Sequence, residues 1–313
     1  MDDPAHASLH PVTPETIAAA LHQRLGLEVA PSSMSLEFRD WRWVATLPEG
    51  LCVYVADTPE HAARLEREAR LLRLLQTRVH FAVPRLHQAD PGLALQVRGM
   101  VPGAQLGGDG RERAFADQPQ GARLAEELAR VLAQLHGAIT IAEGSALGFT
   151  RNQSILPGAD VLDARLKDRL ADPKIATTFA ALIERYRAVE VELSDLVLLH
   201  GDVWGGNLAV DLATGALNGL FDFGDAGLGD RHLDLMYIHS FGEAFTRRLL
   251  EVYSERSKHA VSYQRTALYH AIAAFAALAD TDNADGKLLE QRQRWIAEVC
   301  NGTIARIALN VGQ

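Results

Sequence analysis

Three side chains that could share one magnesium ion lie within residues 196–235. Asp202 follows an apolar run at residues 196–199, Asn207 comes five positions later, and Asp222 stands directly before a Phe-Gly pair. Carboxylate and amide oxygens are hard ligands, which suit Mg²⁺ better than zinc or copper. Together the three residues predict a magnesium site, although each one alone is equally well explained as a polar turn residue.

A β-hairpin is expected to bring these residues together. Apolar residues follow Asn207 and precede Asp222, and the turn formers Thr214 and Gly215 lie between the two segments. This pattern is typical of two antiparallel strands with a tight turn. The strand ends of a hairpin lie side by side, so we expect Asn207 and Asp222 to meet, close to Asp202.

The order of the three residues resembles the layout of phosphoryl-transfer sites in protein kinases, with a base followed by two metal ligands. The His-Gly-Asp form at residues 200–202, followed by Gly229-Asp230 and Asp234-Leu235, resembles the aminoglycoside phosphotransferase and choline kinase family of small-molecule kinases. The Trp-Gly-Gly-Asn run at residues 204–207 looks most like the fructosamine and ketosamine kinases. Phe223-Gly224 is closer to the aminoglycoside and homoserine branches.

The resemblance implies a role for each of these residues. Asp202 would accept the proton of the acceptor hydroxyl, while Asn207 and Asp222 would hold Mg²⁺ against the phosphates of ATP or GTP. Three further residues are assigned to the structure around the site: His200, Asp230 and Asp234. The implied activity is transfer of the γ-phosphate of a nucleotide to a hydroxyl of a small molecule.

The implied fold is α+β and protein-kinase-like, with two lobes. A small lobe with an antiparallel sheet on the nucleotide side is expected over residues 1–103, and a larger, mostly helical lobe over residues 104–313. The larger lobe would carry the catalytic loop, the metal site and the acceptor pocket. A total of 313 residues fits about two domains.

Two nucleotide-binding features that the resemblance implies are missing from this sequence. The resemblance places a glycine-containing loop near residues 36–44 and a phosphate-binding strand lysine near Ala56, yet the first segment has no glycine and residues 43–63 have no Lys or Arg. Glu68 stands where the family has the helix carboxylate that pairs with this lysine. Its alternative is a surface pair with Arg64, four residues earlier.

The missing lysine leaves three interpretations open. Another cation takes its place, a different phosphoryl donor is used, or the protein is a kinase-like nucleotide- or metabolite-binding protein with little or no turnover. The candidate replacement cations are Arg39, Arg42, Arg64 and Arg67. We favour an active enzyme, because a chain without catalysis has little need for Asp202, Asn207 and Asp222 together.

Two groups of residues are assigned to ligands on the resemblance alone. The resemblance makes residues 98–103 the hinge between lobes, where backbone groups bind the base of the nucleotide, and assigns Val97, Arg98 and Gly99 to this contact; an ordinary loop explains the composition equally well. Acidic residues of the helical lobe are candidates for binding a cationic acceptor, with a solvated charged surface as the alternative. These are Glu243, Asp280 and Asp282.

Composition restricts the partners. The net charge of −9 argues against nucleic acid or an anionic membrane surface, both of which call for basic patches. The two cysteines, Cys52 and Cys300, lie far apart in the sequence and form no zinc motif. The acidic N-terminal residues lack the pattern of a signal peptide. We therefore expect a cytoplasmic monomer or homodimer that acts on a small molecule.

Local patterns predict the elements around the site. Thr13-Pro14 and Thr58-Pro59 are typical helix starts. Paired strands are expected at residues 35–47 and 51–56. A helix is expected to end at Gly137. Further expectations are strands at 81–86 and 93–97, a flexible connector at 107–120, a loop at 140–158, and helices at 161–170, 177–192, 243–254, 263–278 and 288–309.

Overall fold

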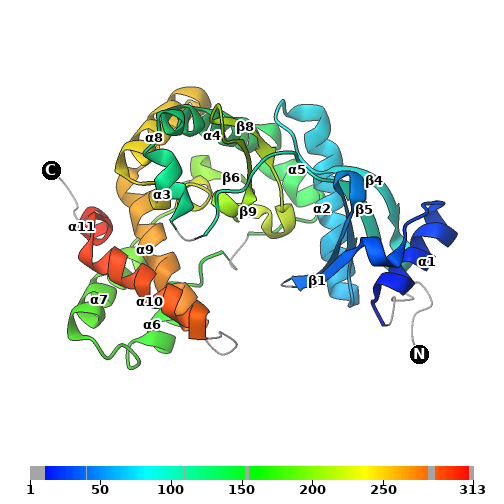
Figure 1. Cartoon of the computed structure of the whole chain (residues 1–313). Coiled ribbons are helices and arrows are strands. Elements are labelled where there is room, and N and C mark those ends of the chain that lie inside the picture. The colour runs from blue at the N-terminus through cyan, green and yellow to red at the C-terminus, as the bar shows by residue number, and fades with distance from the viewer. Residues whose placement is uncertain (1–10, 40, 109, 152–154, 281–285, 310–313) are drawn as a thin grey trace. The chain divides into compact units, whose positions relative to one another are not determined.

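The computed structural model describes residues 11–39, 41–108, 110–151, 155–280 and 286–309 (Figure 1). The chain forms two compact units. The first contains Met1–Gln105, Ala146–Gly148 and Asn207–Gly224, and the second contains Leu106–Ser145, Phe149–Gly206 and Asp225–Gln313. An antiparallel sheet dominates the first unit and helices dominate the second, which confirms the expected α+β class.

A five-stranded antiparallel sheet organises the first unit. Its strands follow the order β1-β2-β3-β5-β4. The strands are β1 (Ser35–Arg39), β2 (Arg42–Leu47), β3 (Leu51–Val55), β4 (Arg85–Asp90) and β5 (Leu95–Gly99). β5 therefore lies inside the sheet, paired with β3 on one side and with β4 on the other.

The single strand expected at residues 35–47 is wrong, because this segment is a hairpin of two strands. The backbone N–H of Trp41 donates to the carbonyl of Arg39 at 2.6 Å and closes the turn. Phe38 lies opposite Trp43, and the two rings pack edge to face with centroids 5.2 Å apart. The turn contains no glycine, so the sequence lacked the usual signal for it.

Two helices cover the two faces of this sheet (Figure 1). Helix α1 (Pro14–Leu25) packs Ile17 and Leu21 against the face formed by the apolar side chains of β2, β3 and β5. Helix α2 (Pro59–Arg78) packs Leu65 against the opposite face, next to Trp41 and Ala56. This arrangement follows from the period of two along each strand, which sends alternate side chains to opposite faces.

Both predicted helix starts are confirmed. The hydroxyl of Thr13 accepts the N–H of Thr16 at 3.2 Å, and Thr16 reaches back to the N–H of Thr13, which completes a capping box. The hydroxyl of Thr58 accepts the N–H of His61 at 3.1 Å. These side chains satisfy backbone donors that a helix leaves unpaired in its first turn.

The predicted hairpin of the central stretch is present and belongs to the first unit. Strand β7 (Leu208–Asp211) pairs with β8 (Ala216–Leu220). The N–H of Ala82 donates to the carbonyl of Asn218, and the N–H of Leu220 donates to the carbonyl of Ala82. These hydrogen bonds of 3.0 and 3.1 Å attach the hairpin to the segment between α2 and β4.

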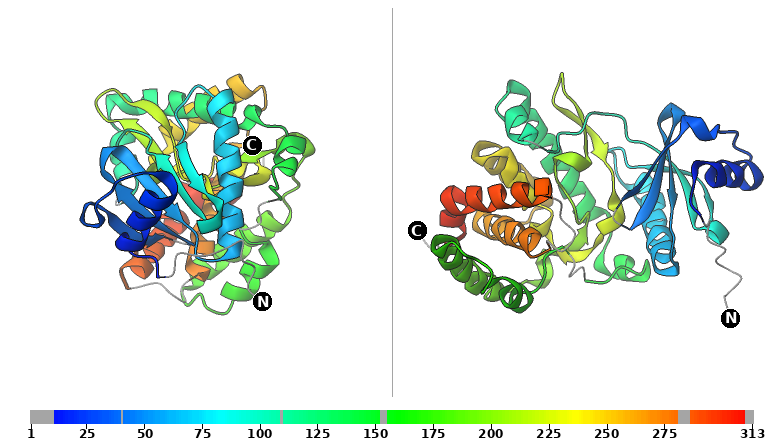
Figure 2. Two further views of the ribbon diagram at one scale, coloured as in Figure 1. Left: turned by 90° about the vertical axis from the view of Figure 1, so that its right-hand side faces the viewer. Right: turned by 60° about the horizontal axis from the view of Figure 1, so that its bottom comes forward.

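The second unit is mainly helical (Figure 2). Its only regular strands in the described residues are β6 (Leu196–Leu199) and β9 (Gly227–Asp230), which form one antiparallel pair. Helix α9 (Tyr263–Ala279) is the most buried, and it packs against α7 and α10. The other helices are α3 (Arg111–Ala116), α4 (Pro119–Ala138), α5 (Ile141–Ala146), α6 (Ala159–Leu166), α7 (Pro173–Arg187), α8 (Glu243–Ser257), α10 (Gly286–Asn301) and α11 (Thr303–Leu309).

Four expectations for this unit are wrong in detail. The predicted connector at residues 107–120 contains α3, and the predicted loop at 140–158 contains α5; both helices are too short for a repeating period to be visible. Helix α4 continues through Gly137 to Ala138. The single helix expected at 288–309 is divided at Gly302 into α10 and α11. Among the described residues, no helix has both the length and the apolar character needed to cross a bilayer.

The attachment of the hairpin leads to a stability prediction. A Cβ added at Gly219 would lie 1.9 Å from the carbonyl oxygen of Ala82. Gly219→Ala is therefore expected to lower the free energy of unfolding by about 1–3 kcal/mol, as overpacking does. The matched control is Gly137→Ala, where a helical Cβ meets nothing within 4 Å, so stability should stay the same or rise by up to about 1 kcal/mol. Urea unfolding of both variants tests this; equal effects would contradict it.

Candidate active site

The hairpin brings Asn207 and Asp222 to the same end of its two strands. The N–H of Phe221 donates to the carbonyl of Asn207 at 3.2 Å, so the residues on either side of this bond are neighbours. Asn207 is buried, whereas the side chain of Asp222 is 38% exposed. Two oxygen-bearing side chains therefore come from adjacent backbone positions, one of them open to solvent.

The backbone of Asp222 adopts the left-handed conformation, with φ of 64°. Residues other than glycine rarely adopt this conformation, and holding one there costs on the order of 1–3 kcal/mol. Such strain persists where the surrounding contacts require it, and it is frequent at functional sites.

A buried arginine binds this carboxylate. Arg42, the first residue of β2, donates from Nη2 to Oδ1 of Asp222. Its guanidinium carbon lies 4.6 Å from the ring centre of Trp41 and 5.1 Å from that of Tyr54. Burial alone would lower the pKa of Arg42, but the carboxylates of Asp222 and Glu68 hold this pKa above its ordinary value. Arg42 is thus a permanently charged partner of Asp222.

Gly224 makes room for these side chains. A Cβ at Gly224 would lie 2.6 Å from Nη1 of Arg42 and 3.2 Å from the ring of Trp41. Arg64 on α2 donates from Nε to the carbonyl of Gly224 at 2.9 Å, and its guanidinium carbon lies 4.4 Å from the ring centre of the same indole. The residue after Phe223 therefore has to be small, because two guanidinium groups and an indole surround it.

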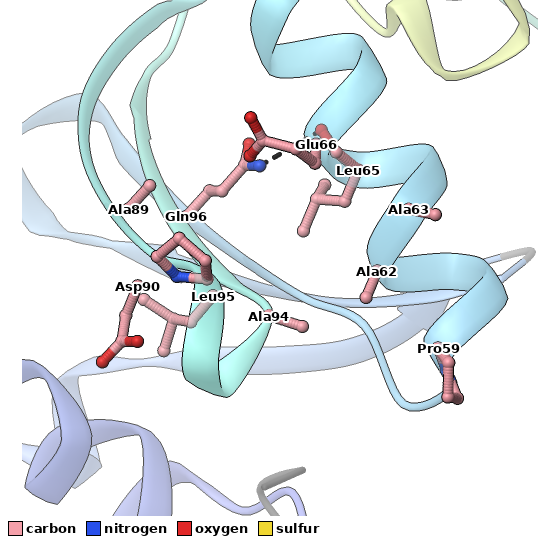
Figure 3. Close-up of a pocket in the computed structure, with 11 residues that line it drawn as sticks. Pro59, Ala62, Ala63, Leu65, Glu66, Ala89, Asp90, Ala94, Leu95 and Gln96 are labelled. Carbon is pink, nitrogen blue, oxygen red and sulfur yellow. Dashed lines mark hydrogen bonds between the residues drawn. The ribbon is translucent and has the colours of Figure 1, made fainter. Parts of the chain in front are cut away.

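Glu68 is not on the surface. It is 2% exposed and binds Arg98 of β5 through two hydrogen bonds, of 2.6 Å and 3.2 Å. Arg98 also donates twice to Oε1 of Gln96, whose amide donates in turn to the backbone of α2 at Leu65 (Figure 3). The alternative of a surface pair between Glu68 and Arg64 was wrong, because a partner 30 residues away in sequence binds this carboxylate.

Strand β5 is longer than predicted. It ends at Gly99 and not at Val97, and its residues pair with β3 and β4. The backbone groups of Val97, Arg98 and Gly99 thus lie within the sheet, and residues 100–103 of the expected hinge follow it. A contact of these residues with a nucleotide base stays a prediction.

A pocket lies elsewhere in the first unit, between α2 and the turn that joins β4 to β5 (Figure 3). Its lining is mainly apolar and includes Ala62, Leu65 and Ala94. Glu66 and Asp90 are its acidic lining residues. No residue of the predicted magnesium site lines it, so it is not part of the candidate active site.

In the second unit, the carboxylate of Asp234 organises the loop that carries Asp202. Asp234 is fully buried and accepts the backbone N–H groups of His200 and Gly201, at 2.7 and 2.8 Å. Its Oδ2 also lies 2.9 Å from Nε2 of His136. Nδ1 of His200 then accepts the N–H of Asp202 at 3.2 Å. Two buried side chains thus determine the backbone course up to the predicted base.

The same loop depends on a glycine. Gly201 has φ of 92°, and a Cβ there would lie 2.1 Å from the carbonyl oxygen of Asp225. Tyr237 lies close to this region: burial, followed by the charges of Asp202 and Asp225, raises its pKa. The phenol of Tyr237 is therefore neutral at any physiological pH and can donate a hydrogen bond.

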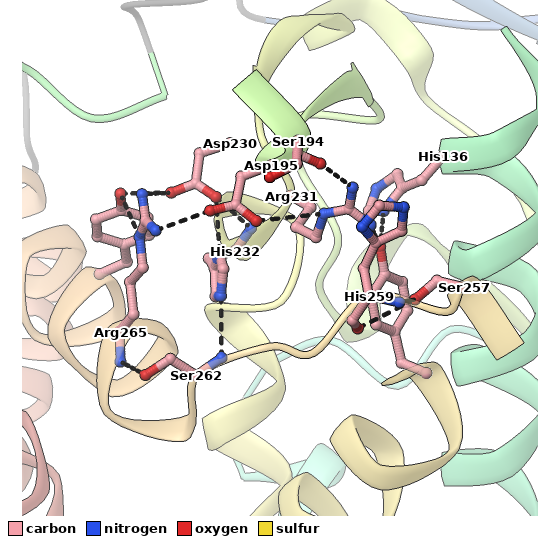
Figure 4. Close-up of polar contacts among 12 residues, drawn as sticks. His136, Ser194, Asp195, Asp230, Arg231, His232, Ser257, His259, Ser262 and Arg265 are labelled. Carbon is pink, nitrogen blue, oxygen red and sulfur yellow. Dashed lines mark hydrogen bonds and ion pairs between the residues drawn. The ribbon is translucent and has the colours of Figure 1, made fainter. Parts of the chain in front are cut away.

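A group of possible metal ligands, Asp195, Asp230 and His232, lies apart from these loops in the described part of the chain. Two arginines balance its two carboxylates, because Arg265 lies 3.1 Å from Asp195 and 2.7 Å from Asp230, and Arg231 lies 3.8 Å from Asp195 (Figure 4). Nε2 of His232 accepts the N–H of Ser262, so Nδ1 carries the proton that Asp230 accepts. These contacts describe an ion-pair network that joins β9 to α9 and gives each of the three candidate ligands a protein partner.

Two of the three acceptor candidates, Glu243 and Asp280, are among the described residues, and both are exposed. Glu243 begins α8, is exposed, and pairs with Arg247 at 2.8 Å. Asp280 follows α9, and its carbonyl accepts a hydrogen bond from Arg292. Asp282 lies outside the described residues. An acceptor-binding role for these three stays a prediction.

The comparisons with known proteins decide the family. The model of the phosphotransferase enzyme family matches residues 35–275. The chain belongs to this family. This confirms the relationship expected from the residues around Asp202, Asn207 and Asp222. It also confirms the expected enzyme class, which is that of a phosphotransferase.

Individual relatives agree with this assignment. An aminoglycoside 3'-phosphotransferase of Streptomyces ribosidificus is 29% identical over 248 residues, which are 73% of this chain and 87% of that enzyme. The enzyme of the same name from Streptomyces fradiae is 29% identical over 117 residues, 34% of this chain and only 42% of that enzyme. Among solved structures, the GDP complex of wild-type aminoglycoside 2'-phosphotransferase-IIIa superposes on this chain with a TM-score of 0.73. The match covers 92% of this chain and 98% of that one at 19% identity, which shows that the two share a fold.

Asp234 gives a prediction for stability and its pH dependence. Burial raises the pKa of Asp234, but the hydrogen bonds from His136 and the loop backbone outweigh burial and keep this pKa below its ordinary value. Its contribution is therefore complete above the unfolded pKa of about 3.9 and is lost as the pH falls through the lower folded pKa. Asp234→Asn should cost about 3 kcal/mol at pH 7, and the difference from wild type should shrink in strong acid.

Chemical denaturation of both proteins between pH 7 and pH 3 measures this difference. Glu126→Gln is the control, because Glu126 pairs with Arg248 on the surface and should change stability little. A constant difference between Asp234→Asn and wild type across the pH range would contradict the assignment of the effect to this carboxylate.

Proposed function

We propose that the protein transfers the γ-phosphate of ATP or GTP to a hydroxyl of a small molecule. The observation that carries this proposal is the end of the hairpin, where Asn207 and a left-handed, solvent-accessible Asp222 come together. Membership of the phosphotransferase enzyme family over residues 35–275 supports the reaction type.

Each residue has a distinct task in this reaction. Asp202 orients the acceptor hydroxyl and accepts its proton, on a loop whose backbone is held by Asp234 and His200. The amide oxygen of Asn207 and the carboxylate of Asp222 are hard donors that fit Mg²⁺. When bound, this ion neutralises charge on the nucleotide phosphates. Phosphoryl transfer needs little covalent chemistry from the protein, so positioning and charge are its main contributions.

The acceptor is proposed by chemistry. The relatives from Streptomyces are named for aminoglycosides, which are cationic, and a net charge of −9 suits a cationic acceptor. Glu243 and Asp280 are exposed carboxylates on the helical unit that could receive amines. Aminoglycosides are therefore the first acceptors to test, followed by ketosamines, choline, homoserine and simple sugars. The GDP in the similar structure makes GTP a donor to test beside ATP.

A second candidate is a nucleotide-binding protein with little turnover. The observation that favours it is the ion pair between Arg42 and Asp222, which occupies the carboxylate proposed to bind Mg²⁺. Incubation with Mg-ATP or Mg-GTP and the acceptor panel separates the two candidates. Phosphorylated product supports the enzyme; magnesium-dependent nucleotide binding without product on any acceptor supports the binding protein.

The proposed base gives a kinetic prediction. Asp202→Asn should lower kcat by about 10²–10⁴-fold, the usual contribution of a positioned base, and should leave nucleotide affinity nearly unchanged. Asp211→Asn is the matched control, because Asp211 caps the turn of the β7–β8 hairpin through the N–H of Ala213. Steady-state kinetics with the best acceptor provide the measurement. Full activity in Asp202→Asn would remove Asp202 from the mechanism.

A further inference from the structure

The phosphates of a nucleotide carry several negative charges, and a site for them needs donors and positive charge beyond one metal ion. The sequence has no Lys or Arg from Trp43 to Ala63, so strand β3 supplies none. We propose that Arg42 binds the nucleotide phosphates in place of the missing strand lysine. This inference rests on the proposed function and deepens it.

The sheet register places Arg42 where a cation on β3 would act. Trp43 pairs with Val55 in the antiparallel ladder of β2 and β3. The pairing ends there, and one further step in the same register would place Arg42 opposite Ala56. This is the face that carries Tyr54, whose ring centre lies 5.1 Å from the guanidinium carbon of Arg42. Ala56 is the position expected to hold the lysine. A long cationic side chain from Arg42 therefore enters the same space from the neighbouring strand.

The two buried arginines of this sheet are bonded differently. Arg98 uses Nε, Nη1 and Nη2 in four hydrogen bonds to Gln96 and Glu68, so it is committed to holding α2 against the sheet. Arg42 has its bond to Asp222, and its buried Nε has no hydrogen-bond partner among the residues that the structure describes. Buried donors are nearly always satisfied, so an orphaned Nε indicates a partner that is still to bind.

The surroundings of Arg42 hold it in position without using its donors. Trp41 and Tyr54 offer ring faces, which attract a guanidinium but leave its N–H groups in the plane unpaired. Gly224 leaves the space that Nη1 needs. A planar guanidinium whose buried Nε lacks a partner among the described residues matches phosphate oxygens well, because two of its N–H groups can bind at once.

Two arginines thus take the two contacts, with the helix carboxylate and with the phosphates, that the resemblance gives to one lysine. Arg98 binds the helix carboxylate Glu68, and Arg42 faces the Asp222 end of the hairpin. The competing explanation is that Arg42 is only a counter-ion that stabilises the strained turn at Asp222. The two explanations differ in one measurable respect. A direct phosphate ligand strengthens ADP binding over adenosine binding even without Mg²⁺, whereas a counter-ion of Asp222 reaches the phosphates only through the metal.

The test compares adenosine and ADP on full-length protein by calorimetry, first with Mg²⁺ and then with EDTA in its place, and the series with EDTA decides. Guanosine and GDP replace these ligands if wild type prefers guanine nucleotides. Arg42→Met removes the charge, and Arg42→Lys keeps it. Loss of a charge-assisted contact should weaken ADP binding by about 10- to 100-fold in Arg42→Met, with adenosine affinity unchanged within about twofold. Arg42→Lys should lie between Arg42→Met and wild type, because it keeps a point charge without the fork.

Arg39→Met is the matched control, since Arg39 lies in the same hairpin but is exposed and pairs with Glu37 at 2.8 Å. It should bind both ligands as wild type does. ADP affinity unchanged in Arg42→Met, or ADP and adenosine weakened equally, would overturn the proposal. If Arg42→Met does not fold, Arg42→Lys decides by the same comparison. Wild-type protein that binds no nucleotide would instead overturn the proposed function itself.

Discussion

The ion pair between Arg42 and Asp222 is the contact on which the nucleotide side of the site depends. It joins residues 180 positions apart and holds a carboxylate whose backbone is in the left-handed conformation. The pair is only partly buried, so it neutralises the charge of Asp222 while leaving that side chain accessible. A cation next to a carboxylate that is proposed to bind magnesium keeps the site intact without the metal, and gives the phosphates a donor when they arrive.

Two carboxylates that are buried, unlike that of Asp222, support the site in a different way. Glu68 fastens α2 to the sheet through Arg98, and Asp234 fastens the loop at residues 200–202 through His136 and two backbone N–H groups. Both carboxylates are fully paired. Removing one partner would lower the stability of the fold strongly, because an unpaired buried charge is costly. Structural carboxylates are thus buried and satisfied, whereas the carboxylate proposed for the metal is exposed.

Local signals in the sequence predicted local structure well. Thr13 and Thr58 cap helices through their own neighbours, and Thr214-Gly215 marks a hairpin turn, so these elements follow from short-range chemistry. The spacing around Asp202 pointed to the family that the comparisons found. The two arginine pairs could not be predicted in this way, because Glu68–Arg98 and Arg42–Asp222 join distant segments. In addition, the sequence does not show which face of the sheet a strand arginine occupies until the strand register is known. The hairpin that sets the register of Arg42 was not predicted, because its turn at Trp41 contains no glycine.

The most direct test of the account is a crystal structure with ADP, or GDP if that binds better, and Mn²⁺, in which the anomalous signal locates the metal. The account predicts a metal peak bound by oxygens of Asn207 and Asp222, and a guanidinium of Arg42 that has left Asp222 for a phosphate. A nucleotide bound with no metal at these oxygens, and with the ion pair between Arg42 and Asp222 unchanged, would contradict it.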